Sequence, residues 1–130
     1  MLFKFPKNDK QFIWTSHVKR KMLQYRLSDQ KIKLILNNPA RTETGIAPRT
    51  VAKMKRNDTP KRKEELWVMY QEMSEDKKPQ TNNKRLQAIS NPKRIKVISA
   101  WRYPGVSPRR EVPVPQDILE ELEKAIIDDN

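Results

Sequence analysis

The sequence has 130 residues, of which 35% are hydrophobic and 34% charged, and its formal net charge is +12. This length suffices for one domain, and the low apolar content with ten prolines predicts a packed core smaller than the chain. The absence of cysteine excludes disulfides, a thiol nucleophile and a cysteine zinc site. With a single histidine, any other metal site would need carboxylates, so we expect no metal and no other cofactor.

The positive charge is unevenly distributed along the chain. Residues 1–115 hold 27 Lys and Arg against 10 Asp and Glu, whereas residues 116–130 hold one Lys against six acids. A basic body of this kind attracts polyanions through counterion release, which favours RNA or the ribosome as partner. A merely soluble surface is the simpler alternative. No segment has the roughly 18 consecutive apolar residues of a membrane span, and the N-terminus lacks a signal-peptide pattern, so we expect a cytoplasmic protein without a membrane partner.

Residues 14–39 predict two helices. Thr15 and Ser16 are good caps for the first, and Ser28 with Asp29 begins the second, which Pro39 ends. Apolar residues recur at helical spacing in both. The stripes are Val18, Met22 and Tyr25 in the first helix and Ile32, Ile35 and Leu36 in the second.

Strands are expected after the helices. Residues 12–14 are either a first strand or a hydrophobic staple, and residues 40–56 hold two short strands or one broken strand, with 51–56 at a sheet edge. Residues 66–70 are apolar on both faces, which predicts a central strand that pairs with residues 95–103 in an antiparallel hairpin. Strict alternation in that second strand places Val97, Ser99 and Trp101 on one face and Ile98 and Ala100 on the other.

These elements predict an α+β fold, with two N-terminal helices packed on a three- to four-stranded antiparallel sheet and a C-terminal helix. The expected organisation is a tail at 1–10, a domain at 11–104 with a basic loop near 74–93, a proline-rich connector at 105–115 and an acidic helix at 116–130. The acidic helix docks its apolar side on the domain, lies over the basic face, or contacts a partner. Composition leaves these three alternatives open.

The first third of the chain resembles a small bacterial family of unknown function whose members begin roughly T-x-H-A-x-x-R-M-x-x-R-G-I-S. The residues that carry the resemblance are Thr15-Ser16-His17, Met22, Arg26-Leu27-Ser28, Ile32 and residues 35–39. That family is similar in layout to the RelE/ParE and BrnT toxins of the barnase-colicin-RelE group, so the resemblance implies a RelE-like domain that acts on RNA or derives from one. The family histidine falls on His17, its first helical arginine on Lys21 or Arg20, and its next arginine on Arg26. Lys21 keeps the charge of that arginine but not its bidentate fork.

Metal-free RNA cleavage needs an acid/base group and cations that stabilise the growing phosphate charge. His17 has a suitable pKa, Lys21 lies one helical turn further on the same face, and Arg20, Arg26 and Arg102 would hold the phosphate. We therefore take His17, Lys21, Arg26 and Arg102 as candidate catalytic residues. A lone histidine at the start of a helix is more often structural.

Other side chains are candidates for binding rather than catalysis. Aromatic residues on a sheet, such as Tyr70, Trp101 and Tyr103, can stack bases, but core packing is the simpler interpretation of Trp67, Trp101 and Tyr70. Basic runs at 53–56, 61–63 and 93–96 would follow a phosphate backbone or form a solvated face. The candidate nucleic-acid-binding residues are Arg20, Lys53, Lys55, Arg56, Lys93, Arg94 and Lys96.

Three hypotheses remain open at the level of sequence. The first is an RNA-binding domain that also acts as a metal-independent endoribonuclease, which requires His17 and its cations to meet in one open pocket. The second is a non-enzymatic module that binds nucleic acid or the ribosome through a basic surface. The third is an interaction protein that receives an acidic partner such as an antitoxin and has an apolar groove beside its positive charge.

Overall fold

The structure, a computed structural model, describes residues 4–73 and 94–128, and the side chains of the last helix as far as Leu122. The predicted basic loop near 74–93, with Lys93, lies outside the described residues. The elements in chain order are β1 (Phe12–Trp14), α1 (Ser16–Tyr25), α2 (Asp29–Asn37), β2 (Arg41–Thr44), β3 (Thr50–Arg56), β4 (Glu64–Met73), β5 (Arg94–Pro104) and α4 (Gln116–Asp128).

The strands form a five-stranded mixed sheet of order β1-β5-β4-β3-β2. β1 runs parallel to β5, and the other neighbouring strands are antiparallel, including the predicted hairpin of β4 and β5. The α+β class is therefore confirmed, but the expected sheet of three to four purely antiparallel strands was wrong. The difference arises because residues 12–14 pair as a strand, and residues 40–56 form two strands rather than one.

Both N-terminal helices begin at the residues that the sequence indicated. The Thr15 hydroxyl accepts a hydrogen bond from the Val18 amide at 3.0 Å, and the Ser28 hydroxyl accepts one from the Lys31 amide at 3.1 Å. α1 ends at Tyr25, and the next residue, Arg26, caps it in a left-handed conformation with φ 56°. α2 ends at Asn37, two residues before Pro39.

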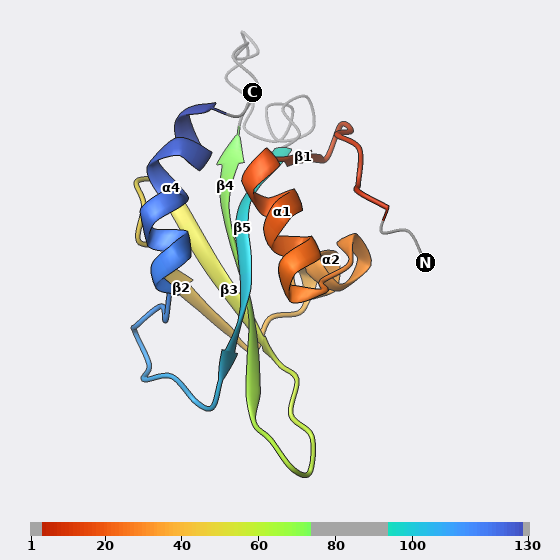
Figure 1. Ribbon diagram of the computed structural model, residues 1–130. Coiled ribbons are helices and arrows are strands. Elements are labelled where there is room, and N and C mark those ends of the chain that lie inside the picture. Colours follow the sequence, from red (N-terminus) through yellow and green to blue (C-terminus); the bar gives the residue numbers. More distant parts are fainter. Residues whose placement is uncertain (1–3, 74–93, 129–130) are drawn as a thin grey trace, which may run out of the picture.

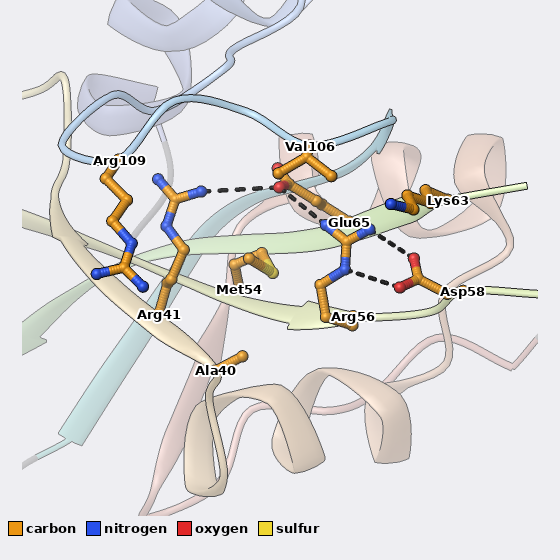
Figure 2. A pocket seen from close by; sticks show the side chains of 9 residues that line it. All are labelled: Ala40, Arg41, Met54, Arg56, Asp58, Lys63, Glu65, Val106 and Arg109. Atoms are coloured by element: carbon orange, nitrogen blue, oxygen red, sulfur yellow. Dashed lines mark hydrogen bonds and ion pairs between the residues drawn. The ribbon is translucent and has the colours of Figure 1, made fainter.

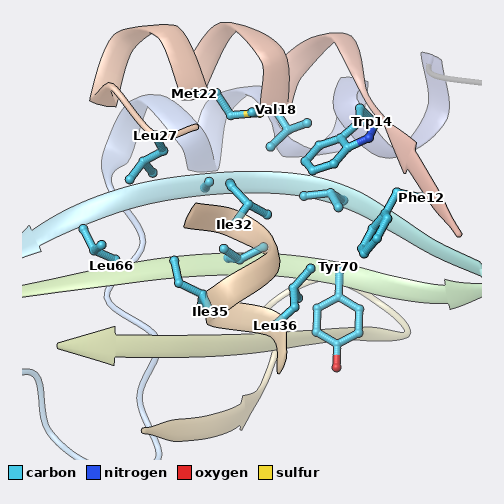
Figure 3. Close-up of a cluster of buried hydrophobic side chains, with 13 residues drawn as sticks. Phe12, Trp14, Val18, Met22, Leu27, Ile32, Ile35, Leu36, Leu66 and Tyr70 are labelled. Carbon is cyan, nitrogen blue, oxygen red and sulfur yellow. The ribbon is translucent and has the colours of Figure 1, made fainter. Parts of the chain in front are cut away.

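Helices cover both faces of the sheet, with α1 and α2 on one side and α4 on the other (Figure 1). Side chains of α1 and α2 point toward the strands in the first core (Figure 3). The buried members of this core are Phe12, Trp14, Val18, Met22, Leu27, Ile32, Ile35, Leu36, Leu66, Val68, Tyr70, Val97 and Ala100. The second core, beneath α4, consists of Ala52, Met54, Trp67, Met69, Ile98, Trp101, Ile118 and Leu122. Core packing of Trp67, Trp101 and Tyr70 is thus confirmed.

A bulge in β5 overturns the strict alternation expected for that strand. Met69 pairs with Ser99 but the next β4 residue pairs with Val97, so Ile98 is an extra residue in β5. Val97 consequently belongs to the α1–α2 core, whereas Ile98 and Trp101 belong to the core beneath α4. The prediction that Val97 and Trp101 share a face was wrong because one inserted residue inverts the alternation beyond it.

The position expected for β3 at a sheet edge was also wrong, because β2 pairs with it on the outer side. Its own alternation follows the expected pattern. Ala52 and Met54 point into the core beneath α4, and Lys53 reaches toward α2 on the opposite face. β3 and β4 continue past the helices as a hairpin, which projects from the lower end of the molecule in Figure 1.

Candidate nucleic-acid interface

His17 and Lys21 lie on α1 and contact acidic residues of α4, and they are only 1% and 4% exposed. The Lys21 ammonium donates to Asp117 at 2.6 Å and to Gln24 at 3.1 Å, and it lies 3.5 Å from Glu121. Burial alone would lower the pKa of Lys21, but the hydrogen bond and charge of Asp117 outweigh burial and raise it. The two candidate catalytic residues on α1 are therefore engaged by acids of α4.

The imidazole of His17 bridges β5 and α4. Its Nε2 lies 2.8 Å from the Ser99 hydroxyl. Its Nδ1 lies 2.9 Å from Oε2 of Glu121, close enough for an ion pair but without hydrogen-bond geometry, so neither atom has a hydrogen-bond partner among the described residues. Burial lowers the pKa of His17, partly offset by the Glu121 charge and reinforced by Lys21 and Arg20. Burial of the ring thus favours the neutral form of the imidazole.

Ser99, His17 and Glu121 together have the order of a hydrolytic triad, with hydroxyl, imidazole and carboxylate in sequence. Sequence reasoning did not find this arrangement, because its members are on β5, α1 and α4 and no local motif joins them. Ser99 is fully buried, so no substrate carbonyl reaches its hydroxyl in this conformation. In this conformation the three side chains connect β5, α1 and α4 through polar contacts.

Arg26 and Arg102 are the other two candidate catalytic residues, and they meet at the end of α1 rather than at His17. Arg102 donates through Nε to the Tyr25 carbonyl at 2.6 Å and through Nη2 to the Arg26 carbonyl at 3.3 Å. A third bond joins its Nη1 to Glu64 at 2.7 Å. Arg102 thereby stabilises the C-terminal end of the helix, where a cation is favourable. The side chain of Arg26 is exposed.

The candidate nucleic-acid-binding residues are spread over several surfaces. Lys53 donates to the Leu36 carbonyl at 3.0 Å and Lys55 to the Asn38 carbonyl at 3.3 Å, so both contact the end of α2. Arg94 donates to the Asp9 carbonyl at 2.6 Å. Arg20 is exposed on α1, and Lys96 is buried in β5. These positions do not form one continuous stripe.

Arg56 belongs instead to a cavity of about 340 Å³ between β2, β3, β4 and the segment after β5, which we call the cation cavity (Figure 2). Its lining is Ala40, Arg41, Met54, Arg56, Asp58, Lys63, Glu65, Val106 and Arg109. Four cations thus surround two carboxylates. Four segments supply one cation each: β2, β3, the β3–β4 turn and the connector.

Glu65 forms the buried floor of the cation cavity. Its carboxylate accepts from the Ser107 amide at 2.9 Å, from the Ser107 hydroxyl at 2.7 Å and from the Trp67 indole at 2.9 Å. Arg56 lies 3.1 Å and Arg41 3.7 Å from the same group. Burial opposes ionisation, but the Ser107 and Trp67 bonds and the Arg41 charge lower the pKa of Glu65 below its ordinary value. The ionised Glu65 therefore holds the connector against the sheet.

Lys63 and Arg109 differ from the other cations of this cavity. Arg41 is bound by Glu43 and by carbonyls of the connector, and Arg56 pairs with Asp58 at 2.6 Å as well as with Glu65. Lys63 and Arg109 are exposed and make no side-chain hydrogen bond or ion pair with another residue of the described part. Sequence reasoning placed Lys63 in a basic run and Arg109 in the connector, but nothing in the local sequence indicates that they line one cavity.

Two kinds of site have no counterpart in the described ranges. Residues 4–73 and 94–128 contain no group of three or more histidine and acidic side chains placed to hold a metal ion. No helix in the same ranges has the length and apolar content that crossing a membrane requires. Comparison of the chain with protein-family models, with curated proteins and with solved structures gives no match.

Proposed function

We propose that this chain is an RNA-binding domain whose cation cavity contacts the phosphate backbone. The observation that carries the proposal is the pair Lys63 and Arg109, which are exposed beside Arg41 and Arg56 and have no carboxylate of the described residues bound to them. An arginine fork and a lysine ammonium are the usual donors to phosphate oxygens. The preference for RNA over other polyanions rests on the resemblance carried by residues 15–39.

Two further features support this proposal. Residues 1–115 carry 27 basic against 10 acidic side chains, so the cavity lies in a positive field that attracts a polyanion from a distance. Arg41 and Arg56 are held in place by their own carboxylates, and such preorganised guanidinium groups lose little freedom when a ligand arrives.

The same proposal assigns no RNA cleavage to His17 in this conformation. An acid/base group has to come within hydrogen-bond distance of the 2′-hydroxyl that it deprotonates. His17 is 1% exposed and already contacts Ser99 and Glu121, and Lys21 is occupied by Asp117. These contacts favour binding without cleavage over the endoribonuclease hypothesis.

The test is a binding titration of a labelled single-stranded RNA at several salt concentrations, in the presence of EDTA. We expect the double variant Lys63→Gln/Arg109→Gln to bind more weakly, and the slope of log affinity against log salt to fall by about 1.4, since each phosphate contact contributes about 0.7. Analysis of the same samples on a denaturing gel reports cleavage, and we expect the strand to stay intact.

The matched control is Arg49→Gln. Arg49 is exposed and precedes β3, whereas Arg56 ends that strand, so this cation lies at the far end of β3 from the cavity. An equal loss of affinity in the control and in the double variant would contradict the proposed site. Cleavage by the wild-type chain that disappears in His17→Ala, with binding retained, would contradict binding without cleavage.

A further inference from the structure

A second cavity, of about 540 Å³, lies between the end of α1, the end of β5 and the connector, and we call it the tyrosine cavity. Its lining consists of Tyr25, Arg102, Tyr103, Pro104, Pro108, Glu111, Pro113, Val114 and Pro115. The volume falls within the range of about 300–1,000 Å³ that is usual for small-ligand pockets. None of the candidate catalytic or basic residues except Arg102 belongs to it.

The chemistry of this lining suits a flat ring with polar edges. Tyr25 and Tyr103 are half-buried, so each presents part of its side chain to the cavity, and four prolines supply further apolar wall. Arg102 uses three of its five N–H donors in its bonds to Tyr25, Arg26 and Glu64. The Glu111 carboxylate is exposed and forms no hydrogen bond or ion pair with other described residues. A carboxylate of this kind accepts from exocyclic amino groups such as that of cytosine.

The two cavities adjoin through the connector. Pro108 lines the tyrosine cavity and Arg109 lines the cation cavity, although their Cα atoms are only about 3.8 Å apart along the chain. In the same way, Pro104 lines the tyrosine cavity and Val106, two residues later, lines the cation cavity. One nucleotide likewise carries a negative phosphate at one end and an aromatic base at the other.

We propose that the tyrosine cavity receives an unstacked RNA base whose phosphate is bound in the cation cavity, so that the ligand is single-stranded. This inference rests on the proposed RNA-binding function. Proteins that recognise single strands stack bases on aromatic side chains and bind their edges with polar groups. A base in a duplex is stacked and paired, and does not enter such a cavity.

The first measurement compares an RNA strand of about 10 nucleotides, a length typical of single-strand sites, with a strand of equal length and charge that carries abasic positions. We expect the intact strand to bind about tenfold more tightly, since stacking of one base contributes that much or more. Because the protein is unchanged in this comparison, a folding defect cannot produce the difference. A duplex of the same sequence is expected to bind as weakly as the abasic strand.

The second measurement uses variants of Tyr103, whose hydroxyl forms no hydrogen bond with a described residue. Tyr103→Leu removes the ring, and we expect it to bind the intact strand about tenfold more weakly without changing the salt slope. Tyr103→Phe retains the ring and is expected to bind like the wild type. Urea unfolding of both variants shows whether the fold persists.

Equal affinity for intact and abasic strands, with steep salt dependence, would overturn the proposed base site. The RNA-binding function would still stand, and the tyrosine cavity would be assigned to another class of ligand, such as a peptide. Equal loss of affinity in Tyr103→Phe and Tyr103→Leu would also overturn it. Failure of every strand to bind would refute the proposed function itself.

Discussion

At the scale of single residues, His17 is subject to opposing influences on its protonation. Burial lowers its pKa below the ordinary 6.5, while the Glu121 carboxylate raises it and Lys21 lowers it further. The net direction is downward, so the folded protein holds a neutral imidazole at pH values where the unfolded chain binds a proton. The single histidine of the chain thereby couples stability to pH.

We expect the free energy of unfolding to fall as the pH drops below 6.5, because between the lowered pKa and 6.5 the unfolded chain binds more protons than the folded chain. The slope for one group is at most about 1.4 kcal/mol per pH unit. Urea unfolding between about pH 5.5 and 7.5 measures it, and His17→Gln should flatten the profile in this window. A wild-type stability that increases on acidification would mean that His17 becomes charged in the fold and pairs with Glu121.

Glu65 illustrates how one buried carboxylate organises a site. It is fully buried, yet Ser107, Trp67 and two arginines contact it, and its pKa is lowered. Buried charges are tolerated only with such partners. Two of these partners, Arg41 and Arg56, also line the cation cavity, so the carboxylate that binds Ser107 of the connector also positions both guanidinium groups.

At the scale of elements, α4 is held by two different kinds of contact. Ile118 and Leu122 pack into the second core, and Asp117 pairs with Lys21 on α1. The described part of α4 therefore docks by its apolar side, and Asp117 contacts one basic residue, Lys21, beside that core. The side chain of Lys21 is almost fully buried. Without Asp117, its ammonium would therefore lack its closest charged partner.

We expect Asp117→Asn to lower the free energy of unfolding by about 1–2 kcal/mol, because it leaves the buried Lys21 ammonium without its closest charged partner. The double variant Asp117→Asn/Lys21→Met should recover part of that loss, since it also removes the buried ammonium that Asp117→Asn leaves without its closest partner. Urea unfolding provides the measurement.

The control for this pair is Glu120→Gln, an exposed carboxylate on the same helix whose only contact among the described side chains is a long bond from Gln116 at 3.4 Å. It should change stability by less than about 0.5 kcal/mol. If the double variant proved less stable than Asp117→Asn alone, packing of the Lys21 stem would outweigh its charge.

At the scale of the whole molecule, charge acts in two opposite ways. The net charge of +12 attracts a polyanion, but it also makes the folded chain repel itself. The ion pairs at Lys21 and Glu65 are buried or nearly so, and salt screens them less than it screens exposed charges. Salt should therefore affect folding and RNA binding with opposite signs.

We expect the melting temperature of the free protein to rise by a few degrees between about 0.05 M and about 0.5 M NaCl, because screening relieves the self-repulsion. Over the same range the affinity for RNA should fall steeply. Differential scanning calorimetry and the titrations described above provide the two measurements. A melting temperature that falls with salt would contradict this expectation. It would show that exposed ion pairs stabilise the fold by more than charge self-repulsion destabilises it.

Local patterns in the sequence were sufficient for the helices and for the general class of the fold. The caps Thr15 and Ser28 and the apolar stripes act within about four residues, and the structure has α1 and α2 at those positions. The pairing of β4 with β5 and the burial of their aromatic residues also followed from composition, because strongly apolar strands favour the centre of a sheet.

Tertiary structure alone decided the remaining features. The β5 bulge at Ile98 inverts which residues share a face, and it depends on pairing with β4 rather than on residues nearby in sequence. The surroundings of His17 depend on Glu121, 104 positions further along the chain, and both cavities depend on how the connector folds back on the sheet. Charge and periodicity are properties of the sequence, whereas the burial of a charged group or the convergence of side chains depends on contacts between distant segments. For this reason the sequence determined that the body is basic and α+β, and only the fold determined which cations remain available to a ligand.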